Sequence, residues 1–251
     1  ISKENESAYI DHFRHILGSS FNRYQLLNLI TALWKTRRIR LLIKQAASLT
    51  QSKPLVKDPL AVCSVEWLSS TFNMDVVVVI RHPAAVVNSY KQLNWSHPFS
   101  HFLDQDLLIR DHLSSYKTEI GDFVSGNRDI VDQAGLLWKL LHHMIIEYQC
   151  GHTDWHFVRH EDLSMDPMSG FRVIFDKLGL PFDDRIRRVI EKNSRHAKPA
   201  ELKNPYAIKR SSAQATGSWK DQLTAEEVDK IRLRVKDVAD AFYSAEEWKT
   251  H

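Results

Sequence analysis

Glycine is scarce in this chain, with 8 residues among 251, and no glycine-rich phosphate loop is present. Cysteine is scarcer still, because Cys63 and Cys150 are the only two and form no C-x-x-C pattern. Neither a disulfide framework nor a cysteine zinc site is therefore expected, and reduced thiols in a cytosol-like compartment are the default.

Long apolar runs are also missing. None approaches about 18 residues, so no transmembrane span or signal peptide is expected. The net charge of +3 is too small to imply nucleic-acid binding by itself. We therefore expect a cytoplasmic protein, with a lumenal fragment of the Golgi type as the alternative. Apolar residues make up 43% of the chain and charged residues 26%, values of an ordinary globular protein.

The chain opens at Ile1, without a methionine start and without a first strand. We therefore expect it to be a piece of a longer protein.

Two short apolar segments read as strands. "VVVVI", from Val76 to Ile80, is a continuous β-branched run that suits a central parallel strand covered by helices on both faces. A second strand is predicted from Trp155 to about Arg159. Helical periodicity fills residues 7–49 and most of the sequence between the strands, whereas residues 198–220 read as a polar, basic loop. Strands separated by long helical stretches predict an α/β domain with a parallel sheet.

Two helices carry clear boundary signals. Asp166 predicts an N-cap, Pro167 a first turn and Gly179 an end for one of them. Thr224 and Glu227 have the spacing of a capping box at the start of the last helix.

The stretch from Asp75 to Trp95 holds the first candidate site. Arg81 follows the predicted strand, Pro83 suits the first turn of a helix, and Ser89 lies almost two turns further on. Ligands of open α/β sheets sit beyond the carboxyl ends of strands, where free N–H groups of a following helix attract anions. Arginine, hydroxyl and helix terminus together suit a phosphate. The alternative is a structural salt bridge of Arg81, with Ser89 packed beside Ala85.

This segment, strand-R-x-P-x-x-x-x-x-S, resembles the 3′-phosphate-binding segment of sulfotransferases that use 3′-phosphoadenosine 5′-phosphosulfate (PAPS). Three further segments resemble the family in order and spacing: "KDPLAVCSVEWLSSTFNMDVVVVIRHP", "VRHEDLSMDPMSGFRVIFDKLGLPF" and "IKRSSAQATGSWKDQLT", the last with Trp219 as its anchor. They cover roughly Pro54 to Thr224 and are most similar to the tyrosylprotein and carbohydrate branches. The resemblance implies one domain over 1–251, with a P-loop-type parallel sheet flanked by helices and further helices as an acceptor-side cap.

The resemblance also implies roles. Arg81 and Ser89 bind the 3′-phosphate, and Lys57 stabilises the negative charge that develops on the leaving phosphate during transfer. A solvated lysine beside a turn is the alternative for Lys57. His160 either lies near the adenine or fills the strand end.

The late loop supplies the remaining implied residues. Arg210, Ser211 and Ser212 complete the phosphate site, and Ser211 joins Lys57 among the catalytic residues. A disordered basic loop is the alternative. PAPS is the implied co-substrate, and no metal is expected.

Two departures from the family pattern stand out. The first strand and a 5′-phosphosulfate loop of the type P-R-S-G-T-T are absent and are expected before Ile1. Pro59 occupies the position of the histidine base of the small-molecule branch. The base is therefore expected from a carboxylate in the missing part or from a histidine of a substrate loop, such as His97 or His101.

Pairs of histidines at i,i+4 spacing, His97 with His101 and His156 with His160, are compatible with metal ligation. No third ligand is in register with either pair. A metal site is therefore not expected.

The predicted reaction is transfer of a sulfuryl group from PAPS to a hydroxyl or amine of a glycan, peptide or small molecule. The alternatives are a degenerate domain that binds the product nucleotide or an anionic glycan, and a kinase-like P-loop phosphotransferase. The basic runs "KTRRIRLLIK" and "RIRRVIEKNSRHAKP" are typical of solvated helix faces, yet they could attract an anionic acceptor. Nucleic acid is not expected as a partner, because no recognition motif accompanies these runs.

Overall fold

The computed structural model describes residues 1–18, 55–194 and 216–249. It divides into two compact units, Ile1–Trp67 and Leu68–His251. The predicted helical region 7–49 is described only up to residue 18, and of the predicted loop 198–220 only residues from 216 onward are described.

The first unit contains short helices joined by aromatic and polar contacts. They are η1 (Glu6–Ala8), α1 (Ile10–Gly18), η3 (Ala61–Ser64) and the start of α4 (Val65–Phe72). The indole N–H of Trp67 donates a hydrogen bond to Glu6 Oε2 at 2.9 Å, and its ring meets Phe13 edge-on at 5.3 Å between centroids.

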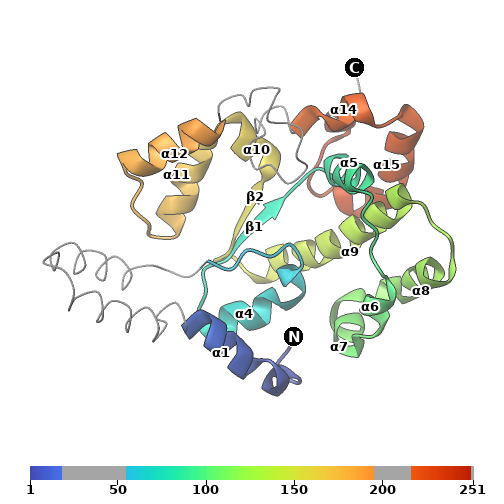
Figure 1. Ribbon diagram of the computed structural model, residues 1–251, viewed down its shortest axis with the longest axis horizontal. Coiled ribbons are helices and arrows are strands. Elements are labelled where there is room, and N and C mark those ends of the chain that lie inside the picture. The colour runs from blue at the N-terminus through green and yellow to red at the C-terminus, as the bar shows by residue number, and fades with distance from the viewer. Residues whose placement is uncertain (19–54, 195–215, 250–251) are drawn as a thin grey trace, which may run out of the picture. The chain divides into compact units, whose positions relative to one another are not determined.

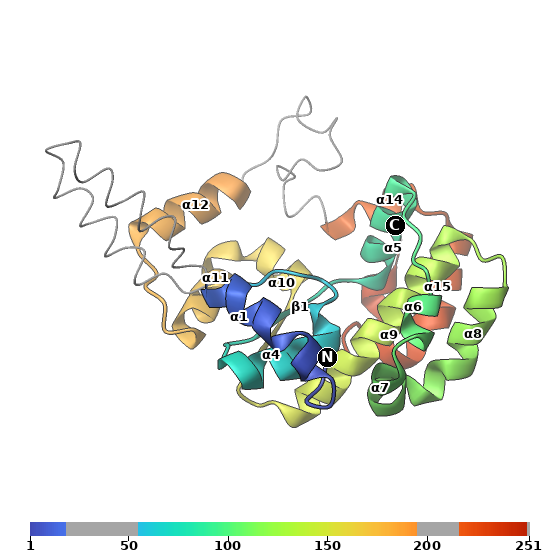
Figure 2. The same cartoon turned by 60° about the horizontal axis from the view of Figure 1, so that its bottom comes forward.

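The second unit holds the sheet and most helices (Figures 1 and 2). Its elements in chain order are β1 (Val77–Ile80), α5 (Pro83–Leu93), α6 (Ser100–Leu103), α7 (Asp106–Leu108), the π-helical turn η4 (Ile109–Leu113), η5 (Ser114–Tyr116), α8 (Lys117–Ser125), α9 (Ile130–Gly151), β2 (His156–Arg159), α10 (His160–Met165), α11 (Pro167–Lys177), α12 (Asp184–Ser194), α14 (Trp219–Gln222), α15 (Ala225–Ala239) and η7 (Ala245–Trp248).

Both predicted strands form, and they pair in parallel as expected. Val77 lies opposite His156, and Ile80 lies opposite Arg159. The two strands therefore end side by side at the same edge of the sheet. The chain is nevertheless mostly helical, and within its described residues the sheet has only these two strands.

The expectation that β1 is covered on both faces is wrong for the described chain. Only Ile80 is buried in this strand, and Val79 is 52% exposed. Successive side chains of a strand point to opposite faces, so Val79 and Ile80 lie in different surroundings. The apolar run shows that both faces of β1 tolerate burial. Whether the second face is covered depends on which other elements pack against the sheet.

The core of the second unit lies among three helices. α9 packs against α15 and α5, and α15 also contacts α5. Both ribbon views show these helices side by side (Figures 1 and 2). Leu136, Leu140 and Met144 of α9 are fully buried, as are Ile231 and Val235 of α15. Spacings of three to four residues place such side chains on one face of each helix.

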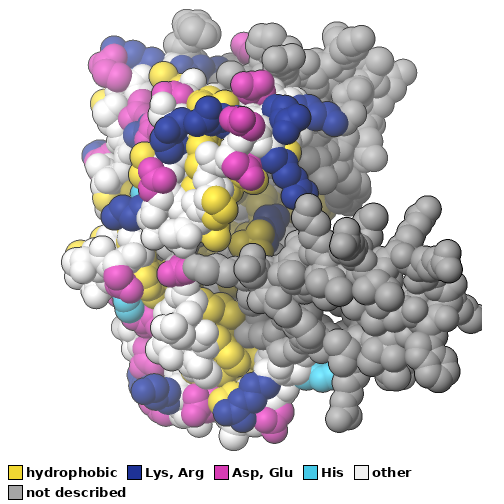
Figure 3. All heavy atoms as spheres, turned by 90° about the vertical axis from the view of Figure 1, so that its left-hand side faces the viewer, with side chains coloured by type: hydrophobic (Ala, Val, Ile, Leu, Met, Phe, Trp, Pro, Cys, Tyr) yellow, Lys and Arg dark blue, Asp and Glu magenta, His cyan; other side chains and the backbone are white. Residues whose placement is uncertain are grey.

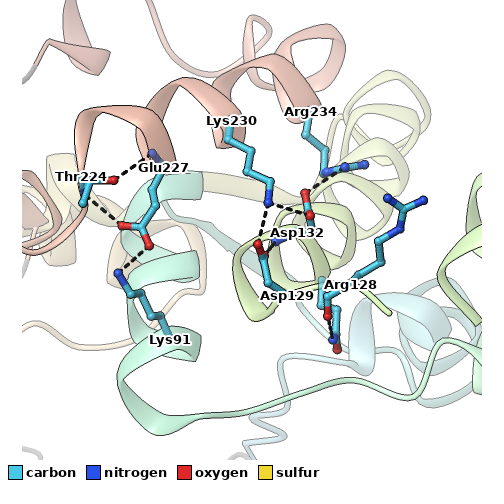
Figure 4. Close-up of polar contacts among 9 residues, drawn as sticks. Lys91, Arg128, Asp129, Asp132, Thr224, Glu227, Lys230 and Arg234 are labelled. Atoms are coloured by element: carbon cyan, nitrogen blue, oxygen red, sulfur yellow. Dashed lines mark hydrogen bonds and ion pairs between the residues drawn. The ribbon is translucent and has the colours of Figure 1, made fainter. Parts of the chain in front are cut away.

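The predicted helix boundaries are confirmed. Asp166 accepts a hydrogen bond from the backbone N–H of Ser169 at 3.1 Å, and Pro167 is the first residue of α11. Gly179 has a φ of +60°, a left-handed conformation that glycine adopts without steric cost. Thr224 and Glu227 form the reciprocal capping box of α15 (Figure 4).

Ion pairs join α15 to α5 and α9 (Figure 4). Lys91 of α5 contacts Glu227 at 2.6 Å, which links the first turn of α15 to the end of α5. Asp132 of α9 accepts from Lys230 at 2.8 Å and from Arg234 at 3.0 Å. No helix in the described parts is both long and apolar enough to cross a membrane.

Candidate functional site

Arg81 and His160 each follow the last residue of a strand, so the parallel register brings them to one edge of the sheet. Arg81 Nη1 donates to Ser89 Oγ at 3.4 Å. Ser89 in turn donates its hydroxyl to the carbonyl of Ala85 at 3.0 Å. Arg81 and Ser89 are both half-buried. The contact between them agrees with the predicted pair, and the bond from Ser89 to Ala85 agrees with the structural alternative, so the choice between the two stays open.

The start of α5 differs from the expectation of free N–H groups. The N–H of Ala84 donates to His82 Nδ1 at 3.2 Å, and the N–H groups of Ala85 and Val86 donate to the His82 carbonyl. His82 thus caps the helix with its own side chain. These three N–H groups already have acceptors, so the start of α5 can attract an anion only through the electrostatic field of the helix dipole.

His82 is a residue that the sequence interpretation missed. Its ring stacks on Trp219, with 4.9 Å between centroids and 6° between planes, and meets the edges of Tyr243 and Trp248. Burial lowers the pKa of His82 to about 3, so the ring is neutral at physiological pH. Trp219, which the sequence resemblance implies as the anchor of the late loop, is held by this stack on His82. The sequence signal for this role was a histidine directly before the proline that begins a helix, because Nδ1 of a histidine at that position can accept a backbone hydrogen bond as an N-cap.

Glu161 connects the same turn to the end of the chain. Its Oε1 accepts from the backbone N–H of His82 at 2.9 Å, and its Oε2 accepts from the Tyr243 hydroxyl at 3.0 Å. The backbone of Arg81 is also held by α9, because its carbonyl accepts from the Trp138 indole at 2.9 Å. The turn that carries Arg81 is thus held by two elements of the core.

Arg159, the last residue of β2, also ties the sheet to the chain end. It donates to the Phe242 carbonyl at 3.0 Å, pairs with Glu247 and lies 4.8 Å from the ring centroid of Tyr243. This arginine is a structural cation, whereas Arg81 is directed to the hydroxyl of Ser89.

His160 lies next to Arg81. Burial is the main cause that lowers its pKa, and the positive charge of Arg81 adds to the shift. Its Nδ1 is buried and has no hydrogen-bond partner within the described chain. The imidazole is therefore neutral at physiological pH, and it adds a flat ring to the site without adding charge.

The remaining predicted site residues are Lys57, Arg210, Ser211 and Ser212, and their roles beside Arg81 stay predictions. Lys57 is exposed and belongs to the first unit, beside a turn in which Asp58 accepts from the N–H of Leu60 at 2.8 Å. Arg210, Ser211 and Ser212 lie outside the described residues. Pro59, which occupies the position of the histidine base of the small-molecule branch, directly follows Asp58 in this turn.

The predicted pair His97 and His101 follows α5. Their ring centroids are 6.3 Å apart, and His97 also packs against Phe99 and Phe102. Burial, followed by the neighbouring His101, lowers the pKa of His97. Within the ranges described, no three His, Cys, Asp or Glu side chains are arranged to hold a metal ion. Cys63 and Cys150 are free thiols.

The strand end gathers hydrogen-bond donors of the kind that an anion needs. A guanidinium and a hydroxyl face each other at the carboxyl end of a parallel strand, and a neutral imidazole lies beside them. An arginine provides planar, paired donors that match phosphate oxygens, and a hydroxyl adds one more donor when it rotates. The 3′-phosphate of a nucleotide, which the sequence resemblance implies as the ligand here, stays a prediction.

Comparison with known proteins identifies the family. A family model described as "Sulfotransferase domain" matches residues 5–242. Carbohydrate sulfotransferase 1 of Rattus norvegicus and of Homo sapiens are each 36% identical to the chain over 67 residues, and that of Mus musculus is 34% identical over the same length. This alignment covers 27% of the chain and 16% of each relative. The family match spans nearly the whole sequence, and the chain therefore belongs to the sulfotransferase domain family.

Proposed function

We propose that this protein is a sulfotransferase that binds PAPS and transfers its sulfuryl group to a hydroxyl, or an amine, of a carbohydrate acceptor. The family match supports sulfotransfer in general. The relatives carry the name carbohydrate sulfotransferase, which favours a glycan over a peptide or small-molecule acceptor.

The observation that carries the proposal is the Arg81–Ser89 pair. The 3.4 Å distance between Arg81 Nη1 and Ser89 Oγ is long for a hydrogen bond. A phosphate at the strand end would offer the guanidinium a charged acceptor, and hydrogen bonds to a charged acceptor are about twice as strong as bonds between neutral groups. The Ser89 hydroxyl would then turn from the Ala85 carbonyl to a phosphate oxygen.

His160 and the late loop complete the proposed nucleotide site. The neutral ring of His160 would lie against the adenosine, where a charged ring would compete with Arg81 for the phosphate. Arg210 and Ser212 would bind the phosphate from the late loop. Trp219, which follows that loop in the chain, is fixed by its stack on His82.

In the transfer step, a bond forms between sulfur and the acceptor oxygen as the bond between sulfur and the 5′-phosphate oxygen breaks. Lys57 would stabilise the charge that develops on the leaving phosphate, and Ser211 would donate a hydrogen bond to the same group. The acceptor hydroxyl loses its proton to a base. His97 is a candidate, since its lowered pKa keeps it neutral and able to accept a proton at physiological pH.

The test compares two nucleotides that differ by one phosphate. Binding of 3′-phosphoadenosine 5′-phosphate (PAP) and of AMP is measured by calorimetry and by thermal shift, because a ligand of the folded state raises its stability. PAP should bind more tightly than AMP. Arg81→Ala should weaken PAP by roughly ten- to a hundredfold, the value of a charged hydrogen bond, and Ser89→Ala by a few-fold. AMP affinity should change little in either variant.

Arg110→Ala is the matched control, since Arg110 is an exposed arginine that pairs with its neighbour Asp111. It should leave PAP affinity unchanged. Equal binding of PAP and AMP, or full PAP affinity in Arg81→Ala, would overturn the proposed site.

A transfer assay with radiolabelled PAPS separates the enzyme from its alternatives. Labelled product with a glycan acceptor supports the enzyme. PAP binding with no transfer to any acceptor supports a nucleotide-binding domain. Tighter binding of ATP than of PAP, with phosphate transfer, supports the kinase-like alternative.

A further inference from the structure

Helix α12 carries a basic surface that the transfer chemistry does not use. Its 11 residues include Arg185, Arg187, Arg188 and Lys192, against Asp184 and Glu191. Three of the four cations, Arg185, Arg188 and Lys192, recur at i, i+3 and i+7. At 100° per residue they fall within about 60° of arc, and they extend along roughly 10 Å of helix. We call these three residues the α12 stripe.

The α12 stripe faces outward. Ile190 is buried on the opposite part of the helix, and α12 lies beside α11, whose buried residue is Ile174. All three stripe residues are exposed. Figure 3 looks at the side of the molecule on which α11 and α12 lie and shows Lys and Arg side chains across its upper part, with Asp and Glu side chains between them.

Within the described residues, the stripe lacks the carboxylate partners that the cations of α15 have. On α15, Lys230 and Arg234 contact carboxylates of α9 (Figure 4). Within the described chain, by contrast, Arg185 and Lys192 have no ion pair, and Arg188 donates to the backbone carbonyl of Asp184 at 3.1 Å.

Arg187 is not part of the stripe. It lies near Asp184, at 3.6 Å, and over the ring of Phe182.

Asp184 and Glu191 offset only part of the repulsion among the cations of α12, because two acids stand against four cations. Like charges three and four residues apart on a helix repel each other. Arg185 and Arg188 also lie in the first half of α12, where the helix dipole disfavours positive charge. A ligand with negative charges along a line would remove both costs.

We infer that the α12 stripe binds a linear anionic polysaccharide, such as the sulfated product of the reaction or an acidic acceptor chain. The inference rests on the proposed carbohydrate acceptor and extends it to a second surface away from the Arg81 site. A row of cations along a helix matches a polymer with repeated charges better than it matches a single small anion. The exposed apolar side chain beside the stripe is that of Val189, and α12 carries no aromatic ring on which a nucleic-acid base could stack.

The test uses the whole chain and a fluorescently labelled heparin oligosaccharide, with binding followed by anisotropy at low and at physiological salt. Arg185→Gln, Arg188→Gln and Lys192→Gln are combined, because glutamine removes the charge and keeps an unbranched polar side chain with a similar helix propensity. The variant should bind heparin roughly ten- to a hundredfold more weakly, since each exposed ion pair contributes a factor of about two to five. The salt dependence of binding should become shallower.

The matched control removes three exposed cations elsewhere: Arg110→Gln, Lys117→Gln and Lys249→Gln. It has the same net charge as the stripe variant, and it should lose less than about threefold. Arg185→Lys combined with Arg188→Lys should keep most of the affinity, which checks that charge at these positions is what binds. Circular dichroism verifies that each variant is folded.

Equal losses in the stripe and control variants would overturn the inference, because net charge alone would then explain binding. Full heparin affinity in the stripe variant would overturn it as well. So would tighter binding of a single-stranded oligonucleotide than of heparin at equal charge. The stripe variant should bind PAP as tightly as the wild-type chain does. If the wild-type chain binds heparin but not PAP, the result contradicts the proposed function and leaves the stripe standing.

Discussion

Glu161 gives one side chain two partners from distant parts of the sequence. One carboxylate oxygen accepts from the N–H of His82, directly after Arg81, and the other accepts from the hydroxyl of Tyr243 near the chain end. Burial, followed by the nearby Glu161 carboxylate, raises the pKa of Tyr243 far above its usual value, so the phenol remains a donor at any physiological pH. The position of the Arg81 turn thus depends on a residue that need not touch the nucleotide.

Glu161→Gln should destabilise the fold by about 1–3 kcal/mol, the cost of leaving a half-buried donor without its acceptor. An amide has one oxygen, so either the N–H of His82 or the hydroxyl of Tyr243 loses its partner. Urea unfolding measures the change. Glu226→Gln, an exposed glutamate in the first turn of α15, is the control and should change the free energy of unfolding by less than about 0.5 kcal/mol. Equal midpoints for both variants would contradict the linking role of Glu161.

At this scale the sequence predicts some partners and not others. The spacing between Arg81 and Ser89 predicts their contact, because both lie on one strand–helix connection whose local geometry is fixed. The contacts of His82 with Trp219 and Tyr243 join residues more than a hundred positions apart. No local pattern encodes them, so only tertiary structure shows that His82 both caps α5 and stacks on an indole.

Among the elements, α5, α9 and α15 are joined by ion pairs as well as by apolar faces. Among the acids of the described residues, Asp132 is the buried one, with its side chain 10% exposed between Lys230 and Arg234. It lies in the first turn of α9, where a negative charge also matches the helix dipole. Asp132 therefore contributes both to its own helix and to the attachment of α15.

Asp132→Asn should lower the free energy of unfolding by about 1–3 kcal/mol, since two cations lose their shared counter-charge in a largely buried position. Chemical denaturation measures the loss. Asp237→Asn provides the comparison, because Asp237 also pairs with a lysine, Lys139 at 3.0 Å, but its side chain is 57% exposed. An exposed pair contributes less than about 1 kcal/mol. A larger loss in Asp237→Asn than in Asp132→Asn would refute this ranking.

Helix ends were predictable, and the surroundings of β1 were not. Asp166, Pro167 and Gly179 act through neighbouring backbone groups, so a short sequence window contains all the information. The exposure of Val79 depends on which elements cover the sheet. The segment "VVVVI" contains no information about those covering elements. The predicted α/β class therefore overstates the share of sheet in the described chain.

Across the whole molecule, two buried histidines make stability depend on pH. Burial lowers the pKa of His82 and of His142 to about 3. His142 stacks on Trp138 at 3.8 Å between centroids, inside the core of the second unit. The unfolded chain protonates both rings near their ordinary pKa of 6.5, whereas the folded protein keeps them neutral.

The unfolded state therefore binds more protons between about pH 6.5 and pH 3. Stability is fully present above pH 6.5 and decreases as the pH falls through this window, by up to about 1.4 kcal/mol per pH unit for each histidine. Urea unfolding at several pH values between 7 and 4 checks this slope.

His82→Asn keeps an acceptor for the N–H of Ala84 but does not titrate. It should flatten the pH dependence by up to about 1.4 kcal/mol per pH unit, even though the variant is less stable overall. An unchanged slope would show that His82 does not contribute to the acid sensitivity.

The pairing of β1 with β2 has a consequence for how the protein is made. Val77 meets His156 only after the intervening helices have been synthesised. A nascent chain that has emerged as far as α8 carries a β-branched segment with unpaired backbone groups and no neighbouring strand. Such a segment can associate with other chains. Translation that pauses before β2 emerges should therefore favour aggregation, and a chaperone that shields the valine-rich segment should improve the yield of native protein.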